Sequence, residues 1–167
     1  MCDDFLFIED VIFSRANLFP GKDVLQDISG TFAIDICDRT GYFDESYIEA
    51  LKEREKVFPT GILVQDTGVA IPHTDPEHVI DSAIAIAVLK NPVEFYHMGT
   101  NPSEGMKVSV TFVIMLAIAG KQHLEMLQKA IQLIQDQDVL RNLIQAENAA
   151  HMIQIIKDKE EKEHENS

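Results

Sequence analysis

Two nearly continuous runs of apolar residues constrain the fold of this chain most strongly. The first covers Ser82 to Leu89 and the second Val108 to Leu116. A strand with one face in water alternates apolar and polar residues, whereas an unbroken apolar run of this length is typical of a strand buried on both faces. We therefore expect a sheet whose central strands are covered on both sides by other elements.

Segments with apolar residues at helical spacing provide that cover. We expect helices over Lys22–Arg39, Asp44–Lys56, Gln122–Gln135, Val139–Ile144 and Asn148–Lys157. Gly41 is placed to end the first helix, and Asp44 is placed to cap the second. The buried stripe predicted for the third consists of Leu124, Leu127, Ile131 and Ile134.

Three shorter strands complete the predicted sheet, over Ile8–Phe13, Ile62–Val64 and Val69–Ile71. Asn91-Pro92 is expected to turn the chain after the first long strand. The predicted fold is α/β, a single domain with a mixed central sheet of about five strands and helices packed on both faces. We place this domain at residues 1–157 and a charged flexible tail at 158–167.

The short strand at Val69–Ile71 leads directly into a histidine between two prolines. Pro72 ends the strand because proline cannot donate to a sheet ladder, and Pro76 fixes the exit of the loop. His73 therefore has little backbone freedom, which suits a reactive group because pre-ordering lowers the entropic cost of attack. The alternative is a surface histidine in a turn.

The composition excludes several classes of partner. The net charge is −14, from 14 basic and 28 acidic side chains, which argues against binding to nucleic acid or to an anionic membrane. The longest apolar run, Val108 to Ala119, is too short to span a bilayer, and no signal-peptide pattern is present. Cys2 and Cys37 form no metal-type pair and fit a reducing compartment. We expect a cytoplasmic protein.

Three motifs, in order, resemble those of a known family. They are Arg54–Ile62 with its Arg-Glu and Thr-Gly pairs, Gly68–His73, and Gln122–Leu127 with its His-Leu pair. This set is similar to the enzyme IIA domains of the sugar phosphotransferase system, of the mannitol/fructose type. The Phe-Pro-Thr-Gly form of the first motif most resembles the galactitol-type branch. Thr74 departs from the family, in which Gly, Ala or Cys usually follows the histidine.

The resemblance implies a phosphoryl relay between proteins. His73 would accept a phosphoryl group on Nε2 from the phosphocarrier HPr and pass it to a cysteine of a IIB protein. That protein would act with a membrane IIC protein in the uptake of galactitol or a related polyol. Arg54 and His123, the latter at a helix start where phosphate is favoured, would offset the phosphoryl charge. This chemistry needs no metal or other cofactor.

Two other interpretations remain open at this stage. His73, Asp75 and His78 are residue types that bind zinc, although Pro76 breaks any regular helix that could align them and no fourth ligand is evident. The same domain could also serve as a phosphorylation-state sensor that binds regulators. The sequence contains neither a Gly-x-x-x-x-Gly-Lys-Ser/Thr loop for a nucleotide nor a Gly-x-Ser-x-Gly esterase motif.

Overall fold

The computed structural model of the protein describes residues 11–14, 46–79, 83–118, 120, 123–147 and 149–166. Within these ranges one sheet has the strand order β1-β4-β5-β3-β2. The strands are β1 (Val11–Ser14), β2 (Gly61–Val64), β3 (Thr67–Ala70), β4 (Ala83–Tyr96) and β5 (Lys107–Ala117). The β1–β4 and β3–β5 pairs are parallel, and the β4–β5 and β2–β3 pairs are antiparallel. The predicted α/β fold with a mixed five-stranded sheet is confirmed.

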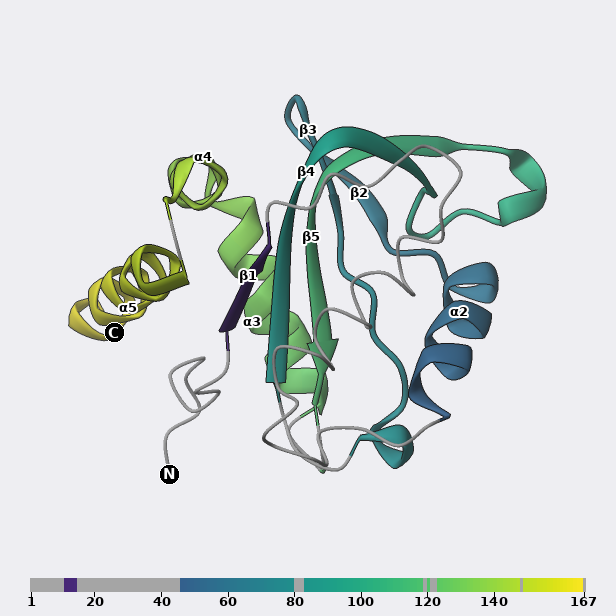
Figure 1. Cartoon of the computed structure of the whole chain (residues 1–167), viewed down its shortest axis with the longest axis horizontal. Helices are drawn as coiled ribbons and strands as arrows, with labels where there is room; N and C mark the ends of the chain where they lie inside the picture. Colours follow the sequence, from purple (N-terminus) through teal and green to yellow (C-terminus); the bar gives the residue numbers. More distant parts are fainter. Residues whose placement is uncertain are drawn as a thin grey trace.

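The described helices are α2 (Tyr47–Val57), α3 (His123–Gln135), α4 (Gln137–Gln145) and α5 (Ala149–Glu165). Two short 3₁₀ segments, η2 (Pro76–His78) and η3 (Pro102–Glu104), lie in loops. In the view of Figure 1, α3 passes behind the sheet, α4 and α5 lie beside the β1 edge, and α2 lies on the side of β2. The helix expected over Lys22–Arg39, its end at Gly41 and the cap at Asp44 lie outside the described residues.

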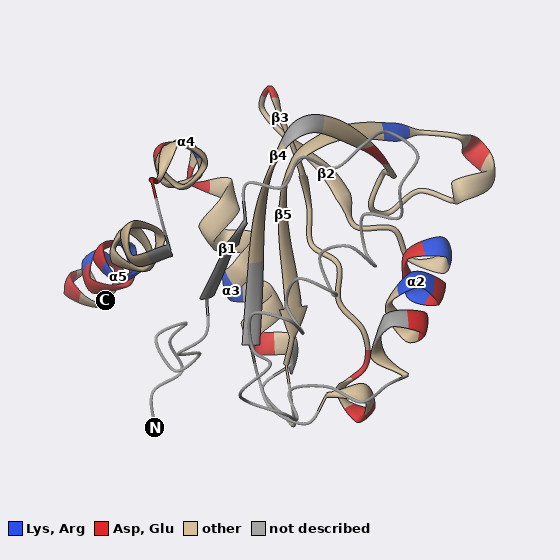
Figure 2. Cartoon of the chain, in the orientation of Figure 1, with Lys and Arg blue, Asp and Glu red and all other residues tan. Residues whose placement is uncertain are grey.

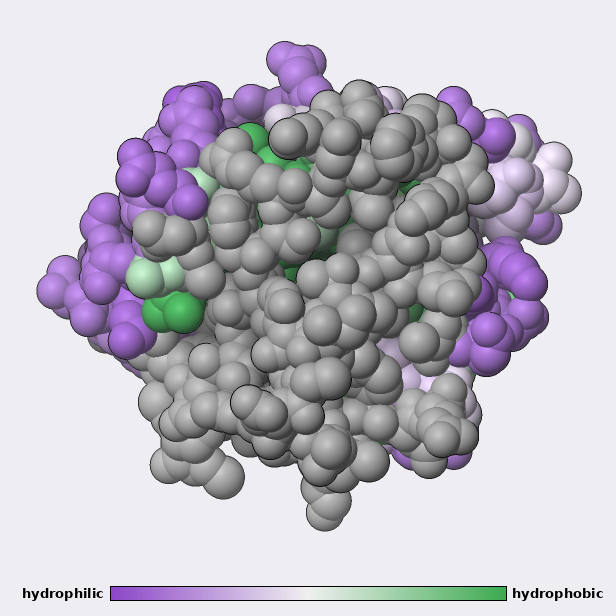
Figure 3. Space-filling view, in the orientation of Figure 1, coloured by the Kyte–Doolittle hydropathy of each residue, from purple (hydrophilic) through white to green (hydrophobic). Residues whose placement is uncertain are grey.

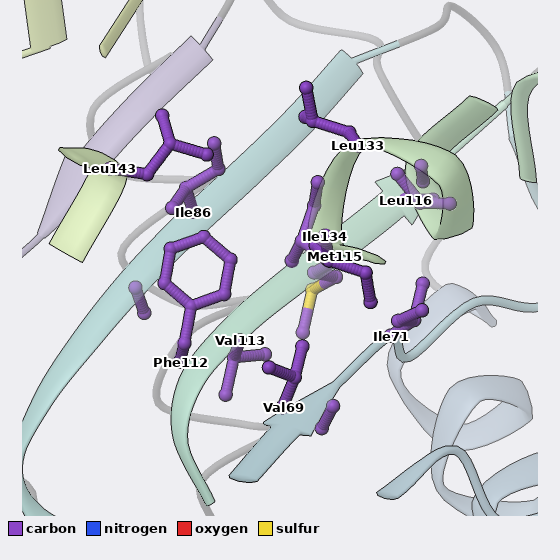
Figure 4. Close-up of a cluster of buried hydrophobic side chains, with 14 of the residues drawn as sticks. Val69, Ile71, Ile86, Phe112, Val113, Met115, Leu116, Leu133, Ile134 and Leu143 are labelled. Carbon is purple, nitrogen blue, oxygen red and sulfur yellow. The ribbon is translucent and has the colours of Figure 1, made fainter. Parts of the chain in front are cut away.

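The core follows the pattern of burial along β5. Its first residues alternate between exposed and buried, and every residue from Phe112 to Ala117 is buried. Figure 4 shows Ile134 of α3 next to Met115 of this strand. Burying one large apolar side chain stabilises a fold by about 1.5–3 kcal/mol, so this two-sided burial holds the centre of the sheet together.

The predicted buried stripe of α3 is confirmed in part, because Ile134 is fully buried and Leu127 and Ile131 pack partly buried against the core. Leu124 is 64% exposed, whereas the buried positions are Met126, Ala130, Leu133 and Ile134. A helix turns by about 100° per residue, so Leu124 lies nearly opposite Met126. The buried positions form an i, i+4, i+7, i+8 pattern, which shares Ile134 with the predicted stripe.

The turn predicted at Asn91-Pro92 is wrong, because β4 continues through it to Tyr96. The register shifts at this point: Val88 pairs with Phe112, and Val93 pairs with Val110. A proline cannot donate to the ladder, and an irregularity of this kind is where a sheet tolerates one.

The charged C-terminal segment is helical, where we expected a flexible tail. Helix α5 continues to Glu165; Lys159 forms an ion pair of 2.9 Å with Asp136, and Glu160 is buried. Figure 2 shows charged residues concentrated on α2 and α5, and Figure 3 shows hydrophilic surface over α4 and α5. None of the helices in the described ranges combines the length and the apolar composition that crossing a bilayer requires.

Candidate active site at the end of strand β3

The exit of β3 is tied to the end of its parallel neighbour β5. Gly68 lies so close to β5 that a Cβ atom there would be 1.8 Å from the carbonyl oxygen of Ser109. Beyond the strand, the Leu116 amide donates to the Pro72 carbonyl at 2.9 Å, and His73 forms an isolated bridge with Leu116. The histidine therefore sits on a backbone held by two strands.

His73 itself is buried, with 6% of its surface exposed. Its Nδ1 lies 2.8 Å from the Ile71 carbonyl oxygen. A carbonyl oxygen can only accept, so Nδ1 carries the hydrogen of this bond. In the neutral ring Nε2 then carries the lone pair, which makes Nε2 the nucleophilic nitrogen.

Arg54 reaches the same loop from α2. Its guanidinium forms an ion pair of 3.2 Å with Asp75 and lies 5.5 Å above the ring centroid of Phe58. The Arg54 Nε is buried, and it has no hydrogen-bond partner in the part of the chain that the structure describes. Helix α2 is anchored to the end of β5 by the Tyr47 hydroxyl, which donates to the Leu116 carbonyl at 3.2 Å. The structure thus brings Arg54 to the loop that contains His73 and Asp75, and its role toward a phosphoryl group stays a prediction.

The third candidate, His123, is the first residue of α3, which we expected to begin at about Gln122. β5 ends at Ala117. Because β3 and β5 are parallel, the carboxyl ends of both strands lie at the same end of the sheet. Free amides and a partial positive charge at a helix N-terminus favour phosphate. The role of His123 in the site stays a prediction.

A hydrogen-bond network behind the histidine was missed by the sequence analysis. The Glu55 carboxylate accepts from the Thr60 amide at 2.8 Å and from the Thr60 hydroxyl at 2.9 Å. The hydroxyl in turn accepts from the Ile71 amide at 3.2 Å. Burial raises the pKa of Glu55, and the bonds from Thr60 oppose that shift. The Arg-Glu and Thr-Gly pairs of the first motif were the available signal.

The structure does not assemble the alternative zinc site. Asp75 is paired with Arg54. His78 forms a hydrogen bond of 2.7 Å between its Nδ1 and the Ser46 hydroxyl, and its Nε2 lies 3.3 Å from the Glu77 carboxylate. Among the described residues, no group of three His, Cys, Asp or Glu side chains could hold a metal ion. The arrangement around His73 favours phosphoryl chemistry instead.

Comparison with known families identifies the family of the chain. Residues 9–159 match the family described as "Phosphoenolpyruvate-dependent sugar phosphotransferase system, EIIA 2". The chain therefore belongs to the type-2 EIIA family of the sugar phosphotransferase system. It is a phosphotransferase component, of the kind that transfers phosphoryl groups through histidine, for a sugar or polyol.

Individual relatives differ in the substrate that they name. The galactitol-specific EIIA component of Escherichia coli (strain K12) is 31% identical over 105 residues, which cover 62% of this chain and 67% of the relative. The mannitol-specific IIA component of Staphylococcus aureus (strain N315) is 27% identical over 158 residues, 92% of this chain and 96% of the relative. A solved complex of mannitol IIA and phosphorylated IIB from Escherichia coli has a TM-score of 0.66 at 14% identity, over 90% of this chain and 95% of that one. At this identity the last likeness concerns the fold alone.

Proposed function

We propose that His73 accepts a phosphoryl group from phospho-HPr and passes it to a cysteine thiolate of a IIB protein. In the first step the P–N bond on HPr breaks as a bond forms between phosphorus and Nε2 of His73. In the second step that bond breaks and a P–S bond forms on IIB. The observation that carries the proposal is the 2.8 Å bond from Nδ1 to the Ile71 carbonyl, because it assigns the lone pair to Nε2.

Arg54 and His123 would stabilise the transferred group without carrying it. In the unphosphorylated protein Arg54 is paired with the carboxylate of Asp75. A phosphoryl group on His73 brings more negative charge into the same loop, and it would draw the guanidinium from Asp75 to the phosphoryl oxygens. Positioning and charge stabilisation are most of what phosphoryl transfer requires.

Exposed apolar side chains near these groups support docking of another protein. Phe58, which follows α2, is 63% exposed, and Leu124, which follows His123, is 64% exposed. A partner that covers them would exclude water from the phosphohistidine, which limits hydrolysis. The net charge of −14 favours a basic partner through electrostatic steering.

The same resemblance supports a proposal for the substrate and the cellular setting. The Phe-Pro-Thr-Gly segment and the galactitol-specific relative support a galactitol or related polyol system. We place the relay in the cytoplasm, with IIC as the membrane component. The test is to charge the protein with labelled phosphate through HPr and then add the IIB protein encoded beside it. Label should move to a IIB cysteine. Label that stays on His73 while changing the binding of a regulator would instead establish the sensor function.

We expect Arg54→Ala and His123→Ala each to slow phosphate uptake from HPr. A charge-assisted hydrogen bond contributes about 1.5–3 kcal/mol, so the rate should fall by roughly tenfold to a hundredfold. Initial rates with labelled phospho-HPr measure this effect. Arg141→Ala is the matched control, because Arg141 pairs on the surface with Asp138 at 3.4 Å and its variant should keep the wild-type rate. Unchanged rates in both site variants would remove these residues from the mechanism.

A further inference from the structure

Three hydrogen bonds in series connect Glu55 to the imidazole of His73. The Thr60 hydroxyl donates to the Glu55 carboxylate at 2.9 Å and accepts from the Ile71 amide at 3.2 Å. The carbonyl oxygen of the same residue, Ile71, accepts from Nδ1 of His73 at 2.8 Å. The Glu55 carboxylate is thus connected to the His73 ring through the Thr60 hydroxyl and the backbone of Ile71.

Each bond in this chain has a defined direction. The Ile71 amide can only donate and the carbonyl oxygens can only accept, so the Thr60 hydroxyl must give its own proton to Glu55. Thr60 is 2% exposed and Ile71 is fully buried, so water does not compete for these groups. The Ile71 amide and carbonyl belong to neighbouring peptide groups, so the bond to Thr60 acts on His73 by fixing the orientation of the Ile71 backbone.

We propose that Glu55 and Thr60 are positioning residues for the transfer reaction, which hold His73 in the tautomer with hydrogen on Nδ1. The inference rests on the proposed function of His73 but concerns the tautomer of the ring, which can be measured without phosphate. Metal-bound histidines are oriented in a similar way, since a carboxylate or carbonyl that accepts from one ring nitrogen fixes the tautomer and raises the basicity of the other. Here the carboxylate acts through Thr60 and Ile71.

The geometry also explains why the network lies where it does. Thr60 stands immediately before β2, and Ile71 stands immediately after β3, the strand that pairs with β2. The bond between them therefore closes the open end of this hairpin at the residue that precedes Pro72 and His73. Without this bond the Ile71 backbone would lose one constraint on its orientation. Its carbonyl would then be held less firmly as the acceptor for Nδ1 of His73.

The test compares three variants of the full chain labelled with ¹⁵N-histidine. Thr60→Val removes the hydroxyl at nearly constant volume, and Thr60→Ser restores it. Thr100→Val is the matched control, because Thr100 also donates from its hydroxyl to a backbone carbonyl, that of His97 at 2.7 Å, in the loop between β4 and β5. The ¹⁵N shifts of the His73 ring give the tautomer fractions, and labelled phospho-HPr gives the rate of uptake.

In Thr60→Val we expect a measurable gain of the tautomer with hydrogen on Nε2 and uptake slower by about tenfold, the lower end of the effect of such outer partners. Thr60→Ser and Thr100→Val should match the wild type in both readouts. If Thr60→Val does not fold, Glu55→Ala provides the comparison, because it removes the carboxylate that accepts from the Thr60 hydroxyl and so frees that hydroxyl to rotate. Wild-type tautomer fractions in the folded variants would overturn the inference. They would do so whether or not His73 carries phosphate, so the two proposals can fail separately.

Discussion

His73→Ala is expected to abolish phosphate uptake from HPr, the largest effect on activity of any single substitution in this chain. The substitution removes the only group to which we assign the P–N bond, and neither Arg54 nor His123 can replace it as the nucleophile in our mechanism. The phosphate on the wild-type protein should be labile in acid and stable in base, as expected of a phosphohistidine. Incubation with labelled phospho-HPr, followed by quantification of protein-bound label, measures both properties.

A matched histidine variant separates loss of the nucleophile from a general effect. His151 is exposed on α5, and His151→Ala should take up one equivalent of phosphate at the wild-type rate. The idea fails if His73→Ala still takes up one equivalent. Loss of uptake in both variants would indicate a general effect on the protein, and the His73→Ala result would then not identify the nucleophile.

Gly68→Ala is expected to be the most destabilising small substitution. The added Cβ would lie 1.8 Å from the Ser109 oxygen, 2.7 Å from the Ser109 carbonyl carbon and 3.1 Å from the Val110 Cα. All three are backbone atoms of β5, so no side chain can rotate away and the strands must separate. Overpacking of this kind costs about 3 kcal/mol, or more where nothing can move. For a chain of this size each kcal/mol lowers Tm by about 2–4 °C, and thermal unfolding followed by circular dichroism measures the change.

The control for this substitution is another glycine, in open space. Gly105 has φ +72, and a Cβ there would meet nothing within 4 Å. Gly105→Ala should therefore cost only the strain of the left-handed conformation, about 1–2 kcal/mol. Equal stability of Gly68→Ala and Gly105→Ala would contradict the crowding argument. A folded Gly68→Ala protein should also transfer phosphate more slowly, because the displaced strand carries His73.

The long central strands were predictable because each contains a nearly unbroken apolar run, which is typical of a strand buried on both faces. The rotation of α3 was predicted only in part, since Ile134 is buried as expected but contact with the sheet buries Met126 and leaves Leu124 exposed. The path through Pro92 was missed for a related reason. A proline is a turn signal locally, but the pairing of β4 with β5 on both sides of it keeps the strand extended.

The site residues also divide into those predictable from the sequence and those that depend on tertiary contacts. His73 stands out in the sequence because two prolines restrict it, and the motif order points to Arg54. The connection from Glu55 through Thr60 to Ile71 depends on a contact between residues 11 positions apart, and no local pattern specifies it. It becomes visible only when β2 and β3 are paired. The ion pair between Arg54 and Asp75 is equally a product of how α2 lies against the loop.

The strand pairing has a consequence for how this protein folds. The β2–β3 and β4–β5 pairs join neighbours along the chain and need only short loops to close. The parallel pairing of β3 with β5 joins segments far apart in sequence, and its larger loop-closure entropy must be overcome before its contacts form. His73 lies on that boundary, through its bridge to Leu116. A chain with both hairpins formed but β3 not yet paired with β5 would have no complete active site, so phosphate uptake would report that the two hairpins have docked.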